Sequence, residues 1–277
     1  MFSYASFQPE VVMPFRPIHV QRLSPRNWLL IAQTLSCRLT RFSGVRNFLW
    51  RARQEEAWEV EREYVIKPFE EVASAYDRGR GGWYRGVLVL LRGKASAPLL
   101  DAGCGTGFIA CKLALQGLGT VVCLEISRAM LKIAWRRALR WGVRASIHPV
   151  CASILRLPFR QSSFSSVVAA AVLHHVYGRM RRVEALRELL RVSRGYVLLI
   201  VWSALAFPNV FRILVTRSKD ILVKWRRSRV LYRYYHLYTP CELREDLREA
   251  GYKNFKVFTW DYKRRLMRRN IVVEAHV

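Results

Sequence analysis

Short, mostly apolar runs alternate with amphipathic stretches along the chain from about residue 98 onward. The apolar runs lie at 98–101, 120–125, 145–150, 165–171 and 196–202. Apolar side chains with helical spacing lie at 107–116, 127–141 and 181–192. Runs of this length are typical of buried parallel strands, and their alternation with helices predicts an α/β fold with a doubly wound parallel sheet.

The pattern continues to the end of the chain. Thr239 and Glu242 form a capping box, with Pro240 at the first helical position, and Gly251 supplies the stop of the helix that they start. Two further runs, at 253–260 and 270–276, read as strands. The domain therefore ends in a helix followed by two strands, with a basic connection between the strands.

One longer apolar run, residues 196–215, has the length of a membrane span. Pro208, Asn209 and Arg212 interrupt this run, and its first seven residues are β-rich. We interpret the run as a strand, a loop and a helix, so we expect no membrane association.

The first 55 residues differ in composition from the rest. Prolines punctuate the beginning, and residues 27–53 then mix apolar side chains with arginines in helical spacing. Three interpretations stay open for this basic arm: it grips a phosphate backbone, it covers a hydrophobic face of the main domain, or it is a mobile tail. We divide the chain into a basic extension, 1–55, and one domain, 56–277.

A glycine-rich turn follows the first strand of the domain. Gly103, Gly105 and Gly107 come directly after Asp101 and before a helix. Glycines let a backbone turn sharply and approach a ligand closely, and the N–H groups of a helix start attract polar groups. Glycine spacing alone also suits dinucleotides. Asp101 argues against a dinucleotide and for a cationic ligand, because a carboxylate repels a pyrophosphate but holds an ammonium or sulfonium group.

A second carboxylate stands about 20 residues further on, where a ribose-binding acid is expected. Glu125 ends the apolar run that begins at Val121. A carboxylate at the tip of this strand can accept hydrogen bonds from both hydroxyls of a ribose. Ligands of open α/β sheets bind along the carboxyl edge, so Glu125 and Asp101 are expected at one site with Ser153 and the loop 174–175.

The charge balance indicates a polyanionic partner. The chain has 47 Lys and Arg against 20 Asp and Glu, a net charge of +27. Nucleic acid fits this charge best, with an anionic membrane or a merely solvated basic surface as alternatives.

The six cysteines form no C-x-x-C pair, so we expect no metal site and no disulfide framework. Residues 1–8 lack the pattern of a signal peptide, so we expect a cytoplasmic protein.

Two stretches carry a resemblance to a known family. L-L-D-A-G-C-G-T-G at 99–107 and V-C-L-E-I-S-R-A-M-L at 122–131 are similar to class I S-adenosylmethionine-dependent methyltransferases, which have a Rossmann-like fold. The resemblance implies S-adenosylmethionine as cofactor. The positions that it implies for cofactor binding are Tyr76, Arg80, Asp101, Gly103, Gly105, Gly107, Glu125, Ile126, Ser153, Ile154 and Leu173.

A later stretch narrows the resemblance. R-Y-Y-H-L-Y at 233–238 resembles the tRNA wobble-uridine methyltransferases, which esterify the carboxylate of 5-carboxymethyluridine, over roughly residues 60–277. This carboxylate is ionised near neutral pH, so its methylation needs no general base. The resemblance implies tRNA as substrate and a small zinc-containing activator subunit as a possible partner. We assign substrate positioning to Arg233, Tyr235 and His236, and RNA contacts to Arg181, Arg182, Lys263, Arg264 and Arg265.

Two positions depart from the family pattern. Related sequences usually have aspartate where Ser153 and Ser165 stand, and the first of these contacts the adenine amine. Two alternative functions therefore stay open. One is a small-molecule methyltransferase of the quinone-biosynthesis type, and the other is a catalytically weak RNA-binding protein on the same fold.

Overall fold

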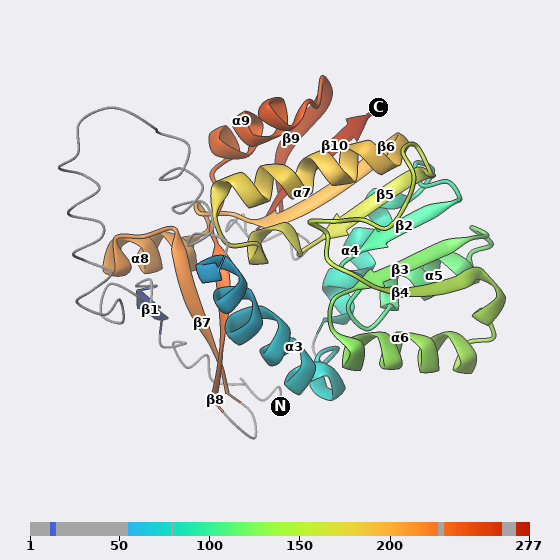
Figure 1. The fold of residues 1–277 in the computed structure, drawn as a ribbon, viewed down its shortest axis with the longest axis horizontal. Coiled ribbons are helices and arrows are strands. Elements are labelled where there is room, and N and C mark those ends of the chain that lie inside the picture. The colour runs from blue at the N-terminus through green and yellow to red at the C-terminus, as the bar shows by residue number, and fades with distance from the viewer. Residues whose placement is uncertain (1–11, 15–54, 79, 227–229, 262–269) are drawn as a thin grey trace, which may run out of the picture.

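A seven-stranded sheet forms the centre of the domain. The computed structural model describes residues 12–14, 55–78, 80–226, 230–261 and 270–277 (Figure 1). The strand order is β4-β3-β2-β5-β6-β10-β9, and all neighbours are parallel except β10, which runs antiparallel to both β6 and β9. The strands are β2 (Leu99–Ala102), β3 (Val121–Glu125), β4 (Ile147–Cys151), β5 (Phe164–Ala170), β6 (Ser193–Trp202), β9 (Asn254–Trp260) and β10 (Asn270–His276). The expected doubly wound α/β fold is confirmed.

Helices cover both faces of this sheet. Helices α7 (Arg179–Val192) and α9 (Pro240–Ala250) pack on one face, above the sheet in Figure 1, and α4 (Gly81–Leu91), α5 (Phe108–Leu115) and α6 (Arg128–Arg140) pack on the other. Successive residues of each strand point to opposite faces. Leu99 accordingly packs with side chains of α4, α5 and α6, whereas Leu100 packs with those of α7 and α9. Because both faces are covered, the strands read as apolar runs in the sequence.

A second, smaller sheet interrupts the chain between β6 and α9, and the sequence pattern did not predict it. After α8 (Phe207–Thr216), the chain forms the antiparallel pair β7 (Asp220–Arg226) and β8 (Val230–His236), and β1 (Val12–Pro14) adds to β7. The apolar run 196–215 is thus divided between β6 and α8. Among the residues that the structure describes, no helix is long and apolar enough to cross a membrane.

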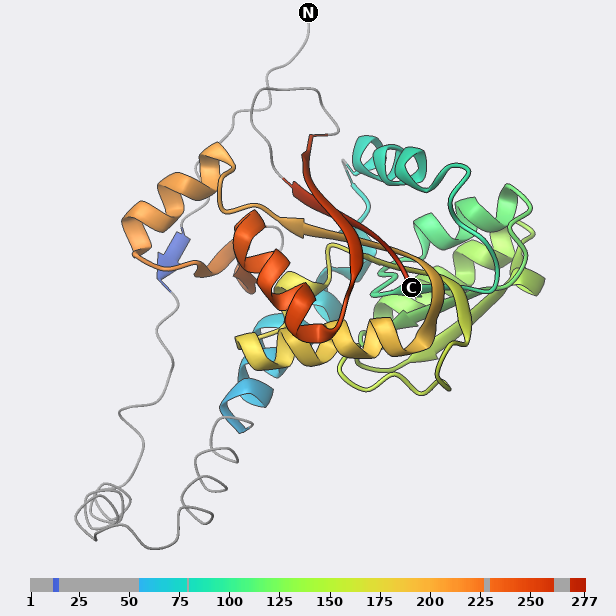
Figure 2. The ribbon, with the colours of Figure 1, turned by 90° about the horizontal axis from the view of Figure 1, so that it is seen from above.

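The β7–β8 hairpin packs against the helical segment that precedes the large sheet. This segment comprises a helix ending at Glu61, the π-helical turn η1 (Arg62–Ile66), α3 (Lys67–Val72) and the 3-10 turn η2 (Ala73–Ala75). Tyr234 of β8 packs with Val60, and Trp225 of β7 packs against the cluster around Phe69. Seen from above in Figure 2, the orange α8 and the green helices lie on opposite sides of the blue segment.

The domain boundary after residue 55 stays a prediction, because residues 1–11 and 15–54 lie outside the described part of the chain.

Candidate functional site

The turn between β2 and α5 requires glycine at two points. Gly103 has φ +78° and Gly107 has φ +69°, a region that other residues rarely adopt. A Cβ on Gly103 would lie 2.5 Å from Cγ2 of Val172, and one on Gly107 would lie 2.6 Å from Cβ of Ala134. The glycines therefore allow the turn to pack tightly between the loop after β5 and α6.

Glu125 lies at the carboxyl end of β3 and faces this turn. Its Oε2 accepts a hydrogen bond from the N–H of Gly105 at 3.0 Å, and its Oε1 accepts from the N–H groups of Ile126 at 2.8 Å and Ser127 at 3.0 Å. Burial raises the pKa of Glu125 despite these donors. A carboxylate has about four acceptor positions, so three backbone donors leave room for a ligand hydroxyl.

Asp101 lies deeper, at the end of β2, and is 2% exposed. Burial and, to a smaller extent, the charge of Glu125 raise the pKa of Asp101 to about 7. Among the described residues, its Oδ2 has no hydrogen-bond partner. A buried carboxylate oxygen without a partner is costly, so this position suits a cationic donor from a ligand.

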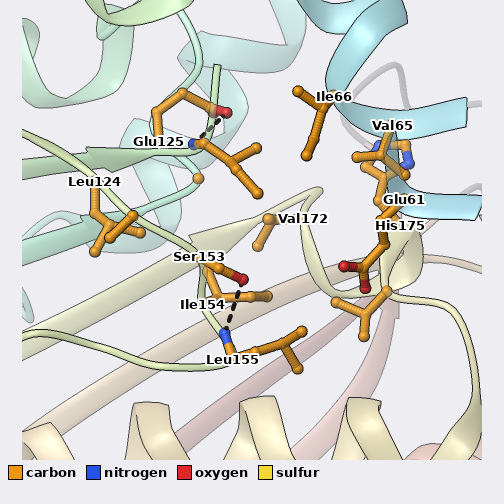
Figure 3. Close-up of a pocket in the computed structure, with 14 residues that line it drawn as sticks. Glu61, Val65, Ile66, Leu124, Glu125, Ser153, Ile154, Leu155, Val172 and His175 are labelled. Carbon is orange, nitrogen blue, oxygen red and sulfur yellow. Dashed lines mark hydrogen bonds between the residues drawn. The ribbon is translucent and has the colours of Figure 1, made fainter. Parts of the chain in front are cut away.

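A pocket of about 450 Å³, part of it open to solvent, lies along this edge of the sheet (Figure 3). Glu125, the last residue of β3, and Ile126, directly after it, line the pocket on one side, and Ser153 and Ile154 line it from the loop after β4. The Oγ of Ser153 accepts a hydrogen bond from the N–H of Leu155 at 3.2 Å. Of the residues with an implied cofactor role, these four and Gly103 line the pocket, whereas Leu173 is fully buried in the core behind it.

Tyr76 and Arg80 come from the segment before α4 and lie next to the glycine turn. The guanidinium of Arg80 lies 4.0 Å from the ring centre of Tyr76. A Cβ on Gly105 would lie 3.5 Å from Cε1 of Tyr76. The structure thus places Tyr76 against the turn that carries the implied cofactor roles, and Arg80 against Tyr76.

Asp77 fixes this segment to the turn, although no motif in the sequence marks it as a site residue. Its Oδ1 accepts hydrogen bonds from the hydroxyls of Thr106, at 2.5 Å, and Tyr84, at 2.8 Å, and its Oδ2 forms a salt bridge with Arg137. Burial opposes ionisation, but these hydrogen bonds and the charge of Arg137 hold the pKa of Asp77 below its usual value. The partners lie 7, 29 and 60 residues away in the sequence, so no local signal marked them.

Arg233 and Tyr235 lie on the face of β8 that looks toward the loop after β5. The Arg233 guanidinium is 6% exposed and lies 4.1 Å from the ring centre of Trp225. The ring of Tyr235 stacks on His174 at 5.1 Å and contacts His175 edge-on at 4.4 Å. His175 also lines the pocket, so these side chains connect β8 to the carboxyl edge of the large sheet.

Both histidines of this cluster are neutral. Burial lowers the pKa of His175 to about 3 and holds that of His174 well below its usual value. The Nδ1 of His174 accepts a hydrogen bond from the backbone N–H of Trp202 at 3.2 Å, so its proton is on Nε2. The Nδ1 of His175 lies 2.8 Å from the carbonyl oxygen of Tyr234, so His175 carries its proton there. One ring therefore offers a donor at Nε2, and the other an acceptor.

His236 lies on the opposite face of β8. Its Nδ1 is 2.8 Å from Oδ1 of Asp220, and its Nε2 is 2.8 Å from Oε1 of Glu242. Burial opposes ionisation of Glu242, but the hydrogen bonds and charges of His236 and Lys219 hold its pKa at about 2. The alternation of side chains along the strand thus separates His236 from Arg233 and Tyr235.

The expected RNA contacts fall in two places. Arg182 is 4% exposed and lies against the ring of Tyr238, so its guanidinium does not face solvent. Arg181 donates a hydrogen bond from Nη2 to Oε2 of Glu61 at 2.7 Å, beside the pocket. Lys263, Arg264 and Arg265 lie outside the described residues.

In the described part of the chain, no group of three or more His, Cys, Asp or Glu is arranged to hold a metal ion.

Comparisons with known proteins agree with this geometry. Residues 100–201 match the family model of a methyltransferase domain. A protein of Encephalitozoon cuniculi, named as a methyltransferase, is 32% identical over 162 residues, which cover 56% of this chain and 70% of that protein. The tRNA (carboxymethyluridine(34)-5-O)-methyltransferase of Arabidopsis thaliana is 30% identical over 149 residues, which cover 53% of this chain. The matched segments span about a third of the length of this relative and of a human one, 34% and 35%.

A solved structure shares the fold. The SAM-dependent methyltransferase of Methanosarcina mazei has a TM-score of 0.54 and 22% identity, over 64% of this chain and 91% of that chain.

Proposed function

Because the chain belongs to the class I S-adenosylmethionine-dependent methyltransferases, we propose that it transfers the methyl group of this cofactor to the carboxylate of a carboxymethyl group on a wobble uridine of tRNA. The observation that carries the proposal is the position of two acids, the buried Asp101 and the partly buried Glu125, at a sheet edge that His175 connects to the buried side chains of Arg233 and Tyr235. The first pair suits the cofactor, and the second suits an anionic acceptor.

The residues at the edge of the sheet fit the cofactor. The unpartnered Oδ2 of Asp101 would accept from the ammonium group of its amino-acid part, and Glu125 would accept from a hydroxyl of its ribose. Tyr76 and Arg80, against the glycine turn, would cover the cofactor from the side of the preceding segment. When bound, the cofactor supplies a methyl group that is activated by the positive charge of its sulfonium.

The protein has to bind and align the acceptor rather than deprotonate it. A carboxylate is already ionised at neutral pH, so the useful groups are donors and cations that hold one of its oxygens and leave the other free to attack. Arg233 lies among aromatic rings, where an ionic contact is stronger than in water. The Nε2–H of His174 and the hydroxyl of Tyr235 are neutral donors in the same cluster.

The resemblance to wobble-uridine enzymes also suggests a partner. We propose that a small zinc-containing subunit activates the chain, with the zinc belonging to that subunit. Activity is therefore to be assayed both with the chain alone and with extract of its native host.

Nucleoside analysis tests the proposal. The protein is incubated with cofactor labelled in the methyl group and with tRNA that carries 5-carboxymethyluridine, and the RNA is digested to nucleosides. We expect a labelled methyl ester of the modified uridine, which mild alkali hydrolyses. Glu125→Gln should abolish the label, and tRNA without the carboxymethyl group should accept none.

Two outcomes would contradict the proposal that the methyl acceptor is a uridine of tRNA. Transfer to a lipid-like acceptor without RNA would favour a small-molecule methyltransferase. Tight RNA binding without any uptake of S-adenosylhomocysteine would leave only an RNA-binding protein.

A further inference from the structure

Glu61 is a buried acid that the reaction outlined above does not use. It ends the helix that precedes η1 and is 7% exposed. Its Oε2 accepts a hydrogen bond from Nη2 of Arg181 at 2.7 Å. Its Oε1 is also buried but has no hydrogen-bond partner among the described residues. Leaving one such oxygen without a donor is costly, so a ligand donor is expected there.

The carboxylate of Glu61 points into the pocket (Figure 3). In that view it points toward the side lined by Ser153 and Leu155, whereas Glu125 lies at the other side. The pocket wall between these acids is mainly apolar, with side chains from Ile126, Ile154 and Val172. A flat aromatic ring with a polar amino group at its far end fits this distribution.

Ser153 lines the pocket near Glu61 but provides no charge there. Its hydroxyl oxygen already accepts from the backbone N–H of Leu155, which stabilises the local turn. The loop after β4 provides no acid on this side of the pocket. Glu61, at the end of the helix that precedes η1, provides one instead.

We propose that Oε1 of Glu61 accepts a hydrogen bond from the exocyclic amino group of the adenine of S-adenosylmethionine, and so replaces the carboxylate that is absent at position 153. This inference rests on the cofactor site described above. Glu61 is then a specificity-determining residue for the base. Arg181 is its positioning residue, because the ion pair fixes the carboxylate and favours its charged form against the effect of burial.

The test is a change of base specificity measured by binding. Affinities for S-adenosylhomocysteine and S-inosylhomocysteine, whose base has a carbonyl oxygen in place of the amino group, are measured by calorimetry. The native protein should prefer the adenine compound by about 10- to 100-fold, because a carboxylate accepts from an amino group and repels a carbonyl oxygen. In Glu61→Gln, Arg181 should hold the amide oxygen and turn the amide N–H₂ toward the ligand. The preference should then shrink to about threefold or less, or reverse.

Two further variants make the test specific. Glu63→Gln is the matched control, because Glu63 lies two residues further on, pairs with Lys67 on the surface, and should keep the native preference. Adding Ser153→Asp to Glu61→Gln should restore part of the preference for adenine. Circular dichroism and thermal unfolding of each variant show whether it is folded, and Glu61→Gln has nearly the same shape as the native side chain.

The outcomes separate this inference from the proposed function. If the native protein binds S-adenosylhomocysteine and Glu61→Gln keeps the native preference, the role of Glu61 is overturned while the cofactor site stands. If the native protein binds the two compounds equally, the inference also fails. If it binds neither, the proposed function itself fails.

Discussion

At the scale of single residues, the site is governed by carboxylates whose charge is costly in the absence of ligand. Asp101 is buried, its pKa is raised to about 7, and one of its oxygens has no partner in the described structure. Near neutral pH, the protonated and ionised forms of this carboxyl therefore coexist in the free protein. An ammonium group interacts favourably only with the ionised form, so ligand binding and loss of this proton are linked.

The affinity for S-adenosylhomocysteine should therefore depend on pH through Asp101. As pH falls below about 7, the fraction of ionised Asp101 falls, and Kd should rise by up to about tenfold per pH unit, levelling off above pH 7. Calorimetry between about pH 5.5 and 7, in two buffers with different ionisation enthalpies, measures both Kd and the proton released on binding.

Asp101→Asn should bind more weakly and lose most of this pH dependence. Glu125→Gln removes a neighbouring negative charge, so the pKa of Asp101 should fall. The affinity that remains in this variant should then begin to weaken only at a lower pH than in the native protein. A native profile that is flat over this range would show that Asp101 is not the group that meets the ammonium.

At the scale of elements, the two faces of β8 carry side chains with different surroundings. Arg233 and Tyr235 face the histidines near the pocket, whereas Tyr234 and His236 face a polar cluster that includes Asp220. This follows from the two-residue repeat of a strand. Adjacent residues of one sequence motif can therefore serve the substrate and the stability of the fold, respectively.

Substitutions on the two faces of β8 should therefore change different quantities, the rate of methyl transfer in one case and the stability of the fold in the other. Arg233→Gln should lower kcat/KM for tRNA by about 10- to 100-fold and leave the affinity for S-adenosylhomocysteine unchanged, because it removes a cation from the acceptor side only. His236→Asn should lower the free energy of unfolding by about 1–3 kcal/mol, since it breaks the bridge between Asp220 and Glu242.

Denaturant titration and steady-state kinetics at a temperature where both variants are folded separate these effects. If His236→Asn instead abolishes methyl transfer without loss of stability, His236 acts on the substrate, and the two faces of β8 do not have separate roles.

The same alternation explains what the sequence could and could not predict. The buried strands of the large sheet and the turn at Gly103 were predicted because each has a local pattern. The hairpin of β7 and β8 was missed, since charged and aromatic residues interrupt its apolar positions and the mixture resembles no single period. The role inferred for Glu61 depends on Arg181, 120 residues away, and on a pocket that exists only in the folded protein.

At the scale of the whole molecule, the net charge of +27 favours an anionic partner. Several of the 20 acids are occupied within the fold: Glu61 with Arg181, Asp77 with Arg137, Glu188 with Arg191, and Asp246 with Arg179. Each of these pairs is neutral, so the excess of Lys and Arg over Asp and Glu remains in the rest of the chain. Such an excess attracts a polyanion over long distances and is screened by salt.

Binding of tRNA should therefore weaken steeply with ionic strength, whereas binding of S-adenosylhomocysteine should not. Each phosphate contacted in a single-stranded loop contributes about −0.7 to the slope of log K against log salt, so contacts to about six phosphates would give a slope near −4. Fluorescence anisotropy with labelled tRNA over about 50–400 mM KCl measures the slope. The internal control is calorimetry with S-adenosylhomocysteine. Its Kd should change by less than about twofold over the same range, because Asp101 is buried and Glu125 lines a pocket, where salt screens charges weakly. A slope near zero for tRNA would mean that the basic excess does not serve RNA binding, and the acceptor would then have to be sought among small molecules.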